Sequence, residues 1–413
     1  MLSSKREKQL VLFLSLLLVF VLYHRLVSKR INEITKSSNQ EIEYSFDKSP
    51  ASPLLSPLPT VTSPFLLALE NYELIHQNIT QHKQPIKIVR MSCGDFCGGW
   101  GDRLKGIFNV IALGLLLDRA FIVQLRNADM ELAQLYQSQP INWNYEPKAA
   151  LKTLNIRCID TTCACVTQQL GLPKGSTDFL QQFDEIVLVT NQDCSGYLFR
   201  ESIFSERRKY YNIDQEPTWR GIVYSRYFQP TPLLSENIHK IIKQNHQDKN
   251  LSLNDNYFPK FGLHVRTGLI QGDPQRFTGE LNALLQSYVD CLQKTQQQSG
   301  IIEKIAFIAV DNPSVLNDLT ARVKNIGFQV LDGNEVGELG HVERFASVRN
   351  LAVRMHAEFE ILRHVKYLLT GQSGFSLYAY KTRILPDAEV FASYEGCRRV
   401  FQDGKDHFTV AFD

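Results

Sequence analysis

The fold is decided by IKIVR (86–90), by the turn SCGDFCGGWG (92–101) that follows it, and by AFIV (120–123). The first and last of these segments have the pattern of β-strands. Apolar residues between them recur at helical spacing: Leu104, Ile107, Phe108, Ile111 and Leu115. The order of strand, glycine-rich loop, helix and strand is the repeating unit of α/β proteins. We therefore expect an N-terminal α/β lobe over residues 85–250.

The remaining residues, 251–413, show the same alternation. Two such blocks predict an α/β protein with two doubly wound, Rossmann-like lobes and a ligand cleft between them. Strands are expected at 261–265, 305–310, 328–331 and 365–370, and helices at about 313–325 and 348–363, with a further helix ending near residue 382.

An apolar run from Leu10 to Tyr23 has basic residues on both sides. It is short for a bilayer span, which needs about 20 apolar residues, but no small-x-small cleavage site follows it. We expect residues 1–8 to be a cytoplasmic tail and residues 9–27 an uncleaved signal anchor, with a cleaved signal peptide or a buried helix of a soluble protein as the alternatives. Residues 28–84, which contain a Pro-, Ser- and Thr-rich segment, are expected to form an extended luminal stem.

Cysteines and sequons indicate the compartment. The eight cysteines are an even number, which permits complete disulfide pairing in an oxidising environment. Asn78 and Asn250 each begin a sequon for N-glycosylation. Buried, reduced cysteines and chance sequons are the alternative, whereas zinc is disfavoured because no four-ligand spacing occurs. With the anchor, the pattern predicts a type II membrane protein whose main part is luminal.

Composition excludes several classes of protein. The chain is 44% hydrophobic and 21% charged, as expected of a globular protein with a sizeable core. The net charge is +2 and the basic residues are scattered, so we expect no binding to nucleic acid. The Gly-x-Ser-x-Gly elbow of a Ser-His-Asp hydrolase is absent.

Three loops carry the candidate chemistry, because ligands of open α/β sheets bind beyond the carboxyl ends of strands. Glycines in the first loop allow close backbone approach, an arginine in the second can donate two hydrogen bonds to a diphosphate, and hydroxyls in the third begin a helix that favours an anion. Taken alone, the first loop could instead be a plain tight turn, the second an exposed pair that caps a strand, and the third a serine helix cap. The loops are Gly98–Arg103, His264–Gly268 and Thr370–Ser376.

In this order the loops resemble those of the GDP-fucose fucosyltransferase superfamily, which includes α1,2-, core α1,6-, nodulation and protein O-fucosyltransferases. The segment from Asp311 to Leu316 and the helical segment from Glu358 to Leu362 are similar to two further family motifs, so the resemblance covers about residues 86–385. It implies a GT-B fold and a Golgi enzyme that transfers L-fucose from GDP-fucose to a glycan or glycoprotein hydroxyl with inversion.

The resemblance also implies roles for individual residues. Arg266 matches the arginine that grips the β-phosphate of the leaving GDP, and His264 matches the neighbouring nucleotide contact. Glu358 stands where the family has a guanine-binding aspartate. The acceptor hydroxyl's base would be Asp102 or Asp273. The other donor-site positions are Gly99, Gly101, Arg103, Asp311, Ser373, Gly374, Phe375 and Ser376.

Metal and acceptor expectations complete the prediction. The chain contains no Asp-x-Asp, the usual metal–diphosphate clamp of the other large glycosyltransferase fold, so we expect no metal requirement. A glycosyltransferase of the same fold with another sugar nucleotide, and a non-catalytic luminal carbohydrate-binding protein, remain alternatives. Residues 126–245 carry no motif that identifies the acceptor or the linkage.

Overall fold

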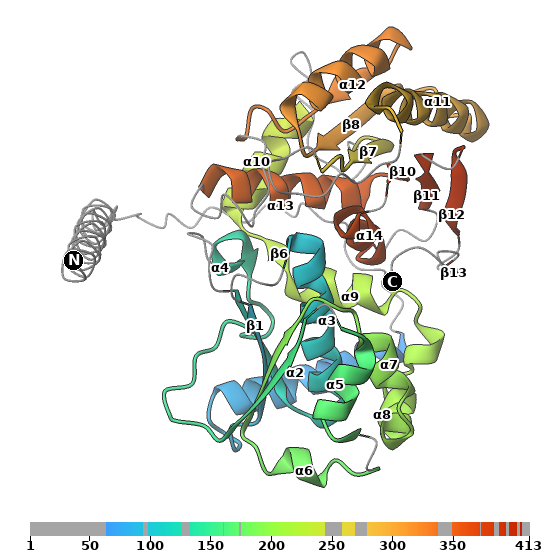
Figure 1. Cartoon of the computed structure of the whole chain (residues 1–413). Coiled ribbons are helices and arrows are strands. Elements are labelled where there is room, and N and C mark those ends of the chain that lie inside the picture. The colour runs from blue at the N-terminus through green and yellow to red at the C-terminus, as the bar shows by residue number, and fades with distance from the viewer. Residues whose placement is uncertain are drawn as a thin grey trace, which may run out of the picture. The chain divides into compact units, whose positions relative to one another are not determined.

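The structure is a computed structural model (Figure 1). It describes residues 63–93, 98–125, 132–159, 161–172, 175–243, 258–268, 279–337, 349–371, 373–383, 388–393, 396–402 and 405–406. No helix within these ranges is both long and apolar enough to cross a membrane. The predicted tail and anchor, together with Asn250 and Asp273, lie outside the described residues.

Residues 88–190 contain a parallel four-stranded sheet in the order β2-β1-β5-β4. The predicted unit is confirmed as β1 (Ile88–Cys93), α3 (Trp100–Leu117) and β2 (Ala120–Leu125). β4 (Thr153–Cys158) and β5 (Glu185–Thr190) complete the sheet. α3 is apolar on nearly all sides and almost entirely buried, as expected of a central helix.

The structure corrects the predicted stem, because Pro64–Thr80 form helix α2. Ser63 Oγ accepts a hydrogen bond from the Leu66 amide at 3.2 Å, and Pro64 occupies the first turn, where proline is tolerated. Pro64 therefore starts this helix, and residues 64–80 are not part of an extended stem. Its buried face consists of Phe65, Ala68, Leu69, Tyr72, Glu73, His76 and Ile79.

The second sheet has seven strands in the order β13-β12-β11-β10-β7-β8-β9. The five from β11 to β9 are parallel, and β12 and β13 are antiparallel. The predicted strands are confirmed as β7 (Phe261–Val265), β8 (Ile305–Val310), β9 (Gln329–Leu331) and β10 (Tyr367–Thr370). Strands that were not predicted are β11 (Glu389–Ala392), β12 (Arg398–Gln402) and β13 (Lys405–Asp406).

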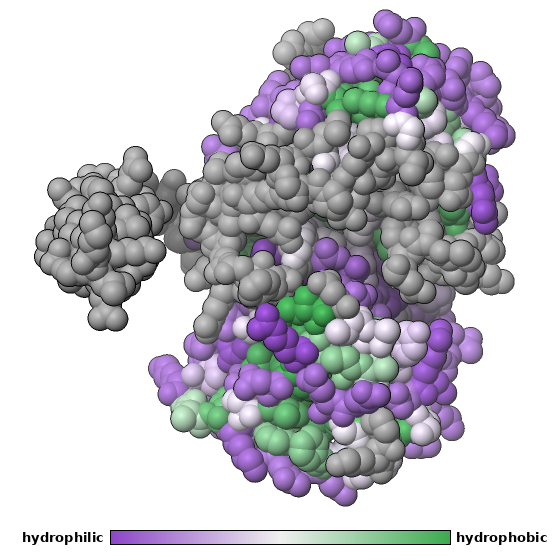
Figure 2. All heavy atoms as spheres, viewed as in Figure 1, coloured by the Kyte–Doolittle hydropathy of each residue, from purple (hydrophilic) through white to green (hydrophobic). Residues whose placement is uncertain are grey.

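Four helices accompany this sheet. The predicted ones are confirmed as α12 (Pro313–Asn325), α13 (Arg349–His364) and α14 (Gly374–Lys381), whereas α11 (Leu281–Ser299) was not predicted. α11 buries only one stripe of residues, and its other positions are polar. Figure 2 shows mostly hydrophilic residues over α11 and α12, as expected of helix faces that contact water.

Short elements make up most of residues 132–243, for which the sequence predicted no regular pattern. They are α4 (Leu132–Leu135), β3 (Tyr136–Gln137), α5 (Cys163–Gln169), α6 (Asp178–Gln181), α7 (Ser195–Arg200), η2 (Ser202–Phe204), α8 (Ser205–Tyr210), η3 (Ile213–Gln215), α9 (Trp219–Tyr227), β6 (Gln229–Pro230) and α10 (Pro232–Lys243). β3 and β6 pair with each other as a small antiparallel ribbon.

One apolar core joins the two sheets. We call residues 63–243 the first half and residues 258–406 the second half. The largest cluster of buried side chains contains Trp100 and Phe108 from the first half and Phe359 and Tyr378 from the second. α14 packs against α3 and α10 packs against α13, so both halves belong to one compact unit.

Among the residues whose side chains the structure describes, three disulfides form: Cys158–Cys165, Cys163–Cys194 and Cys291–Cys397. Cys163 and Cys165, two residues apart on α5, therefore join two different segments to the same short helix. Cys97 lies outside the described residues. The disulfide bonds predicted from the even cysteine count are confirmed for these three pairs.

Candidate active site

Three neighbouring strands of the second sheet bring the predicted loops together. In the order β10-β7-β8, Thr370 is level with His264, and His264 is level with Ala309. Because these strands are parallel, their carboxyl ends meet at one edge of the sheet. The segments that begin at Arg266, Asp311 and Gly371 therefore leave the sheet side by side.

Asp311 shapes the loop that follows β7. Its carboxylate accepts hydrogen bonds from the Thr267 amide at 3.0 Å, from the Thr267 hydroxyl at 2.7 Å and from the Gly268 amide at 2.8 Å. Arg266 Nε lies 3.6 Å from the same carboxylate. Gly268 has a φ of 68°, which glycine adopts without strain. Asp311 was predicted to contact the sugar nucleotide. In the structure its carboxylate instead binds the loop that carries Arg266.

His264 lies on β7, and Arg266 is the first residue after that strand. The His264 ring is 6% exposed and lies 5.0 Å from the ring of Phe375, centroid to centroid. Burial, and then the charge of Arg266, lowers the pKa of His264 to about 3. Its Nδ1 has no hydrogen-bond partner among the residues that the structure describes. A neutral imidazole with one uncommitted nitrogen is therefore held beside Arg266.

The third loop starts α14. Ser373 is the N-cap residue in an extended conformation, and Gly374 and Phe375 form the first turn. The first amides of a helix have no partner within the helix and carry partial positive charge, which favours an anion. The hydroxyl of Ser376 instead contacts the hydroxyl of Thr370 and donates to the Ser373 carbonyl at 3.2 Å. Ser376 therefore stabilises the turn from within.

The first glycine loop lies directly against the third. A Cβ atom built on Gly101 would be 2.6 Å from the Phe375 nitrogen and 2.7 Å from the Gly374 carbonyl oxygen. Only glycine allows the two backbones to approach so closely. Gly99 is the N-cap residue of α3, and Asp102 in the first turn pairs with Lys105 at 2.8 Å. The structure thus brings Asp102 beside Gly374, which lies 272 residues further along the chain. A Cβ atom built on Gly374 would be 3.7 Å from Asp102 Oδ1.

Glu358 lies on α13 beneath the loop that follows β9. It accepts a hydrogen bond from Arg354 Nε at 2.8 Å, and Arg354 also donates to the Gly337 carbonyl at 2.6 Å. A Cβ atom on Gly333 would be 2.6 Å from Glu358 Oε1. Burial raises the pKa of Glu358, and the charge of Arg354 opposes that shift. The spacing of four residues between Arg354 and Glu358 was a sequence signal for this pair that the prediction missed.

Comparison with known proteins gives a fold. No family model matches the chain, and no curated protein matches its sequence. A mutant of Arabidopsis thaliana FUT1 in complex with GDP aligns at a TM-score of 0.56 with 14% identity, covering 83% of each chain. The chain has the FUT1 fold.

Two further solved structures are more distant. NodZ alpha-1,6-fucosyltransferase co-crystallized with GDP aligns at a TM-score of 0.40 with 11% identity, covering 75% of this chain and 95% of that one. POFUT1 in complex with GDP-fucose aligns at 0.39 with 12% identity, covering 73% and 94%. Both TM-scores are below 0.5, so we draw the fold from the FUT1 alignment alone.

Within the FUT1 fold, a buried polar cluster that the sequence did not reveal joins the halves. Tyr136 and Tyr224 of the first half each donate to Glu360 Oε1 at 3.0 Å. Arg363 donates to Glu360 Oε2 at 2.6 Å, and the Tyr136 hydroxyl lies 3.1 Å from His356 Nδ1. The first and second halves are thus connected by hydrogen bonds as well as by apolar packing.

Arg103 lies at the edge of this cluster. It is 5% exposed and donates from Nε to the Gly98 carbonyl at 3.1 Å. Burial, and then the charge of Arg103, lowers the pKa of His356 to about 3. Arg103, predicted to contact the donor, therefore lies close to α13.

Among the described residues, no group of three or more His, Cys, Asp or Glu side chains could hold a metal ion.

Because several histidines are buried, we expect the free energy of unfolding to fall in mild acid. Burial lowers the pKa of His264 and His356 to about 3 and that of His76 to about 4. Below pH 6.5 the unfolded chain binds protons that the folded chain does not. The free energy of unfolding should therefore fall by about 1.4 kcal/mol per pH unit for each such histidine. Urea unfolding at pH 7.5, 6.5 and 5.5 measures this slope.

His76 provides the matched variant for that measurement. Its Nε2 lies 2.9 Å from the Phe121 carbonyl oxygen. In His76→Gln the amide can still donate to this carbonyl, but the titrating group is gone, so the slope should become shallower by about one proton. Equal stability at pH 7.5 and 5.5 in the unsubstituted protein would contradict the prediction.

Proposed function

We propose that this chain is a glycosyltransferase that transfers L-fucose from GDP-fucose to a hydroxyl of a glycan or glycoprotein, with inversion at the anomeric carbon. The observation that carries the proposal is the position of Arg266 and the neutral His264 beside Phe375, at the start of α14. This arrangement offers a diphosphate a charged fork, an imidazole and helix amides. The chain shares its fold with a FUT1 structure that contains GDP.

The proposed reaction breaks the bond between the anomeric carbon and the β-phosphate oxygen. A hydroxyl of the acceptor attacks from the opposite face and forms the new glycosidic bond. Negative charge develops on the departing GDP, where Arg266 and the amides of Gly374 and Phe375 would stabilise it. The hydroxyl proton passes to a base, for which Asp102 is the candidate beside the donor loop, with Asp273 as the other predicted residue.

Guanine recognition is assigned to Glu358 in this proposal. A carboxylate can accept from both the N1–H and the N2–H of guanine. Glu358 Oε1 is occupied by Arg354, whose charge favours the ionised carboxylate. The second carboxylate oxygen of Glu358 would then remain to accept a hydrogen bond from guanine. Because this supports guanine less strongly than an uncommitted carboxylate would, another sugar nucleotide is the second candidate for the donor.

Topology is also part of the proposal. We infer a type II Golgi membrane protein anchored by residues 9–27, with the remainder in the lumen. Three disulfides support an oxidising compartment. Asn78 lies near the end of α2 on a half-exposed position. Its glycosylation in the lumen would support the same orientation, and protease protection in sealed microsomes tests it directly.

Release of GDP from GDP-fucose, measured with a panel of glycan and glycoprotein acceptors, tests the enzymatic proposal. We expect acceptor-dependent release, and competition by GDP at concentrations at which UDP and CMP do not compete. Product anomers resolved by nuclear magnetic resonance would report inversion. Competition by UDP in place of GDP would favour the other sugar nucleotide. Tight GDP binding without turnover on any acceptor would favour the non-catalytic protein.

A further inference from the structure

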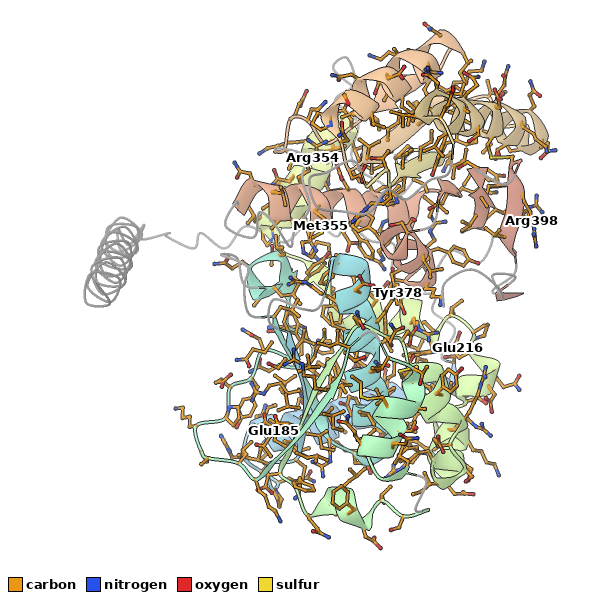
Figure 3. The ribbon with its side chains drawn as sticks, in the orientation of Figure 1. Glu185, Glu216, Arg354, Met355, Tyr378 and Arg398 are labelled. Atoms are coloured by element: carbon orange, nitrogen blue, oxygen red, sulfur yellow. A yellow bond between two sulfur atoms is a disulfide. The ribbon has the colours of Figure 1, made fainter. Side chains whose placement is uncertain are left out.

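Helix α14, which begins with the donor loop, is tied to the first half by a buried hydrogen bond. The Tyr378 hydroxyl donates to Asp193 Oδ2 at 2.5 Å. Tyr378 is 1% exposed, and its ring stacks on Phe108 of α3 with 5.9 Å between centroids. Figure 3 shows Tyr378 at the boundary between the halves. Hydrogen bonds to an ionised carboxylate are about twice as strong as those between neutral groups.

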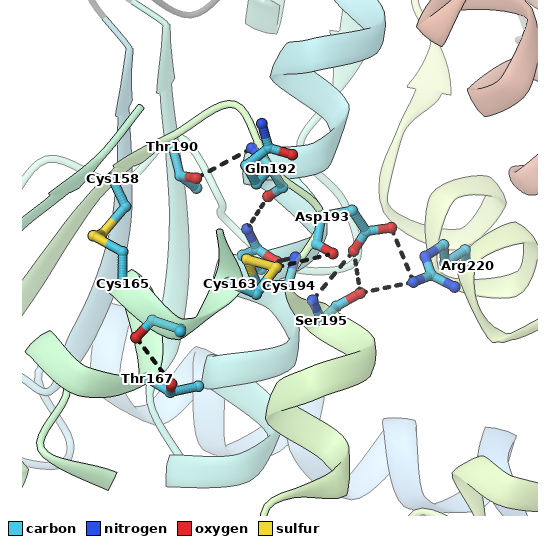
Figure 4. Close-up of a disulfide and its surroundings, with 12 residues drawn as sticks. Cys158, Cys163, Cys165, Thr167, Thr190, Gln192, Asp193, Cys194, Ser195 and Arg220 are labelled. Atoms are coloured by element: carbon cyan, nitrogen blue, oxygen red, sulfur yellow. Dashed lines mark hydrogen bonds and ion pairs between the residues drawn. A yellow bond between two sulfur atoms is a disulfide. The ribbon is translucent and has the colours of Figure 1, made fainter. Parts of the chain in front are cut away.

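The Asp193 carboxylate is ionised and held in place. Oδ1 accepts from the Ser195 hydroxyl at 2.5 Å, and Oδ2 accepts from Arg220 Nη2 at 3.0 Å (Figure 4). Burial alone would raise the pKa of Asp193, but the charges of Arg220 and Lys381 and the surrounding hydroxyls hold this pKa well below its ordinary value. Asp193 is therefore an ionised hydrogen-bond acceptor that its neighbours hold in place.

The segment around Asp193 is itself fastened to two helices of the first half. Cys194 forms a disulfide with Cys163 of α5 (Figure 4). Asn109 of α3 accepts from the Cys194 amide at 2.7 Å and donates to the Gln192 carbonyl at 2.7 Å. The acceptor of the Tyr378 hydrogen bond thus moves with the first half.

Both ends of α14 also press against first-half backbone. Gly101 of α3 lies against Gly374 and Phe375 at its start. At its end, a Cβ atom on Gly221 of α9 would be 2.7 Å from the carbonyl carbon of Arg383. Tyr378 lies between these two backbone contacts. Of these three contacts, the one made by Tyr378 is a hydrogen bond.

We propose that the Tyr378–Asp193 hydrogen bond is a latch that aligns the donor loop with the acceptor-side half. The proposal rests on the proposed function. The groups proposed to bind the nucleotide, His264, Arg266 and the first amides of α14, all belong to the second half, so nucleotide binding needs no bond to the first half. Transfer does need it, because the anomeric carbon and the acceptor hydroxyl must be aligned across the two halves. Tyr378 and Asp193 are positioning residues.

Tyr378→Phe tests the latch, because it removes the hydroxyl and keeps the ring on Phe108. We expect the kcat of transfer to fall about tenfold to a hundredfold and the acceptor KM to rise, while the Kd for GDP changes by less than about twofold. Hydrolysis of GDP-fucose by water, which needs no acceptor alignment, should keep its rate. Tyr197→Phe removes the same group from an exposed position of α7 and should change none of these values.

Asp193 provides the complementary variants. Asn in Asp193→Asn can still accept from Tyr378, so it should retain more transfer than Asp193→Ala. Asp193→Ala combined with Tyr378→Phe should be no slower than Asp193→Ala alone, since both remove one interaction. Loss of GDP affinity in proportion to kcat, or undiminished transfer by Tyr378→Phe, would overturn the latch.

Hydrogen–deuterium exchange separates this proposal from the proposed function. Amides of residues 373–381 should exchange faster in Tyr378→Phe than in the unsubstituted chain, whether or not an acceptor is known. If no acceptor is ever fucosylated, the enzymatic proposal fails while the exchange result still decides whether the bond restrains α14. Unchanged exchange would overturn the latch even in an active transferase.

Discussion

Arg266→Ala is expected to lower the kcat of fucosyl transfer by about 10²–10³-fold, because it removes a preorganised donor from the position where charge develops on the leaving diphosphate. The structure gives this arginine a defined position. Its Nε lies 3.6 Å from the Asp311 carboxylate, which also holds the amides of Thr267 and Gly268. The side chain is therefore oriented before any ligand binds.

Arg266→Lys separates charge from geometry. Lysine keeps the positive charge but cannot donate two parallel hydrogen bonds from a planar group, so its kcat should lie between those of the alanine variant and the unsubstituted protein. Arg322→Ala is the matched control, since Arg322 pairs with Asp318 on the surface of α12. It should leave kcat unchanged. If Arg266→Ala leaves both product formation and GDP affinity unaltered, the donor-site assignment fails.

Gly101→Ala is the second substitution with a large expected effect. The added methyl group would lie 2.6 Å from the Phe375 nitrogen and 2.7 Å from the Gly374 carbonyl oxygen. Both are backbone atoms, which cannot rotate away as a side chain could. We expect the free energy of unfolding to fall by about 1–3 kcal/mol, as for other overpacked sites. Displacement of the donor loop should also lower kcat by about a hundredfold. Urea unfolding and GDP-fucose turnover measure the two effects.

Gly196→Ala is its control. Gly196 lies in α7 with no atom within 4 Å of the Cβ position, so alanine should fit there. Replacing a helical glycine with alanine removes freedom from the unfolded chain and should raise stability by about 0.5–1 kcal/mol. A Gly101→Ala protein as stable and active as the unsubstituted chain would show that the two loops do not require this close approach.

Elements with strong local periodicity were predictable. β1, α3 and β2 follow directly from the alternation and the helical spacing between residues 86 and 123, and α12 from its capping residue Asn312 and Pro313. Two helices were missed for opposite reasons. The start of α2 was missed because a proline-rich segment precedes it and indicated an extended stem. α11 was missed because most of its residues are polar, so its few buried positions give little apolar periodicity.

The three candidate loops were predictable because the residues of each loop are consecutive in the chain. His264 and Arg266 are two residues apart, the first on β7 and the second directly after it, so the sequence alone places them near each other. The role of Asp311 was not predictable, since its contacts to Thr267 and Gly268 cross from one loop to another. Hydrogen bonding within the fold turned an expected ligand contact into a support for Arg266.

The sequence by itself determined the α/β class, the position of the glycine-rich turn at 98–101 and the residues of the three candidate loops, because each depends on neighbours in the chain. Only the tertiary structure decided that Gly101 touches Gly374 and that Tyr378 donates to Asp193, 185 residues away. Contacts of this kind leave no periodic trace in the sequence. They form where packing of the common core brings α14 against α3, and the donor loop is held there by atoms from the other half of the molecule.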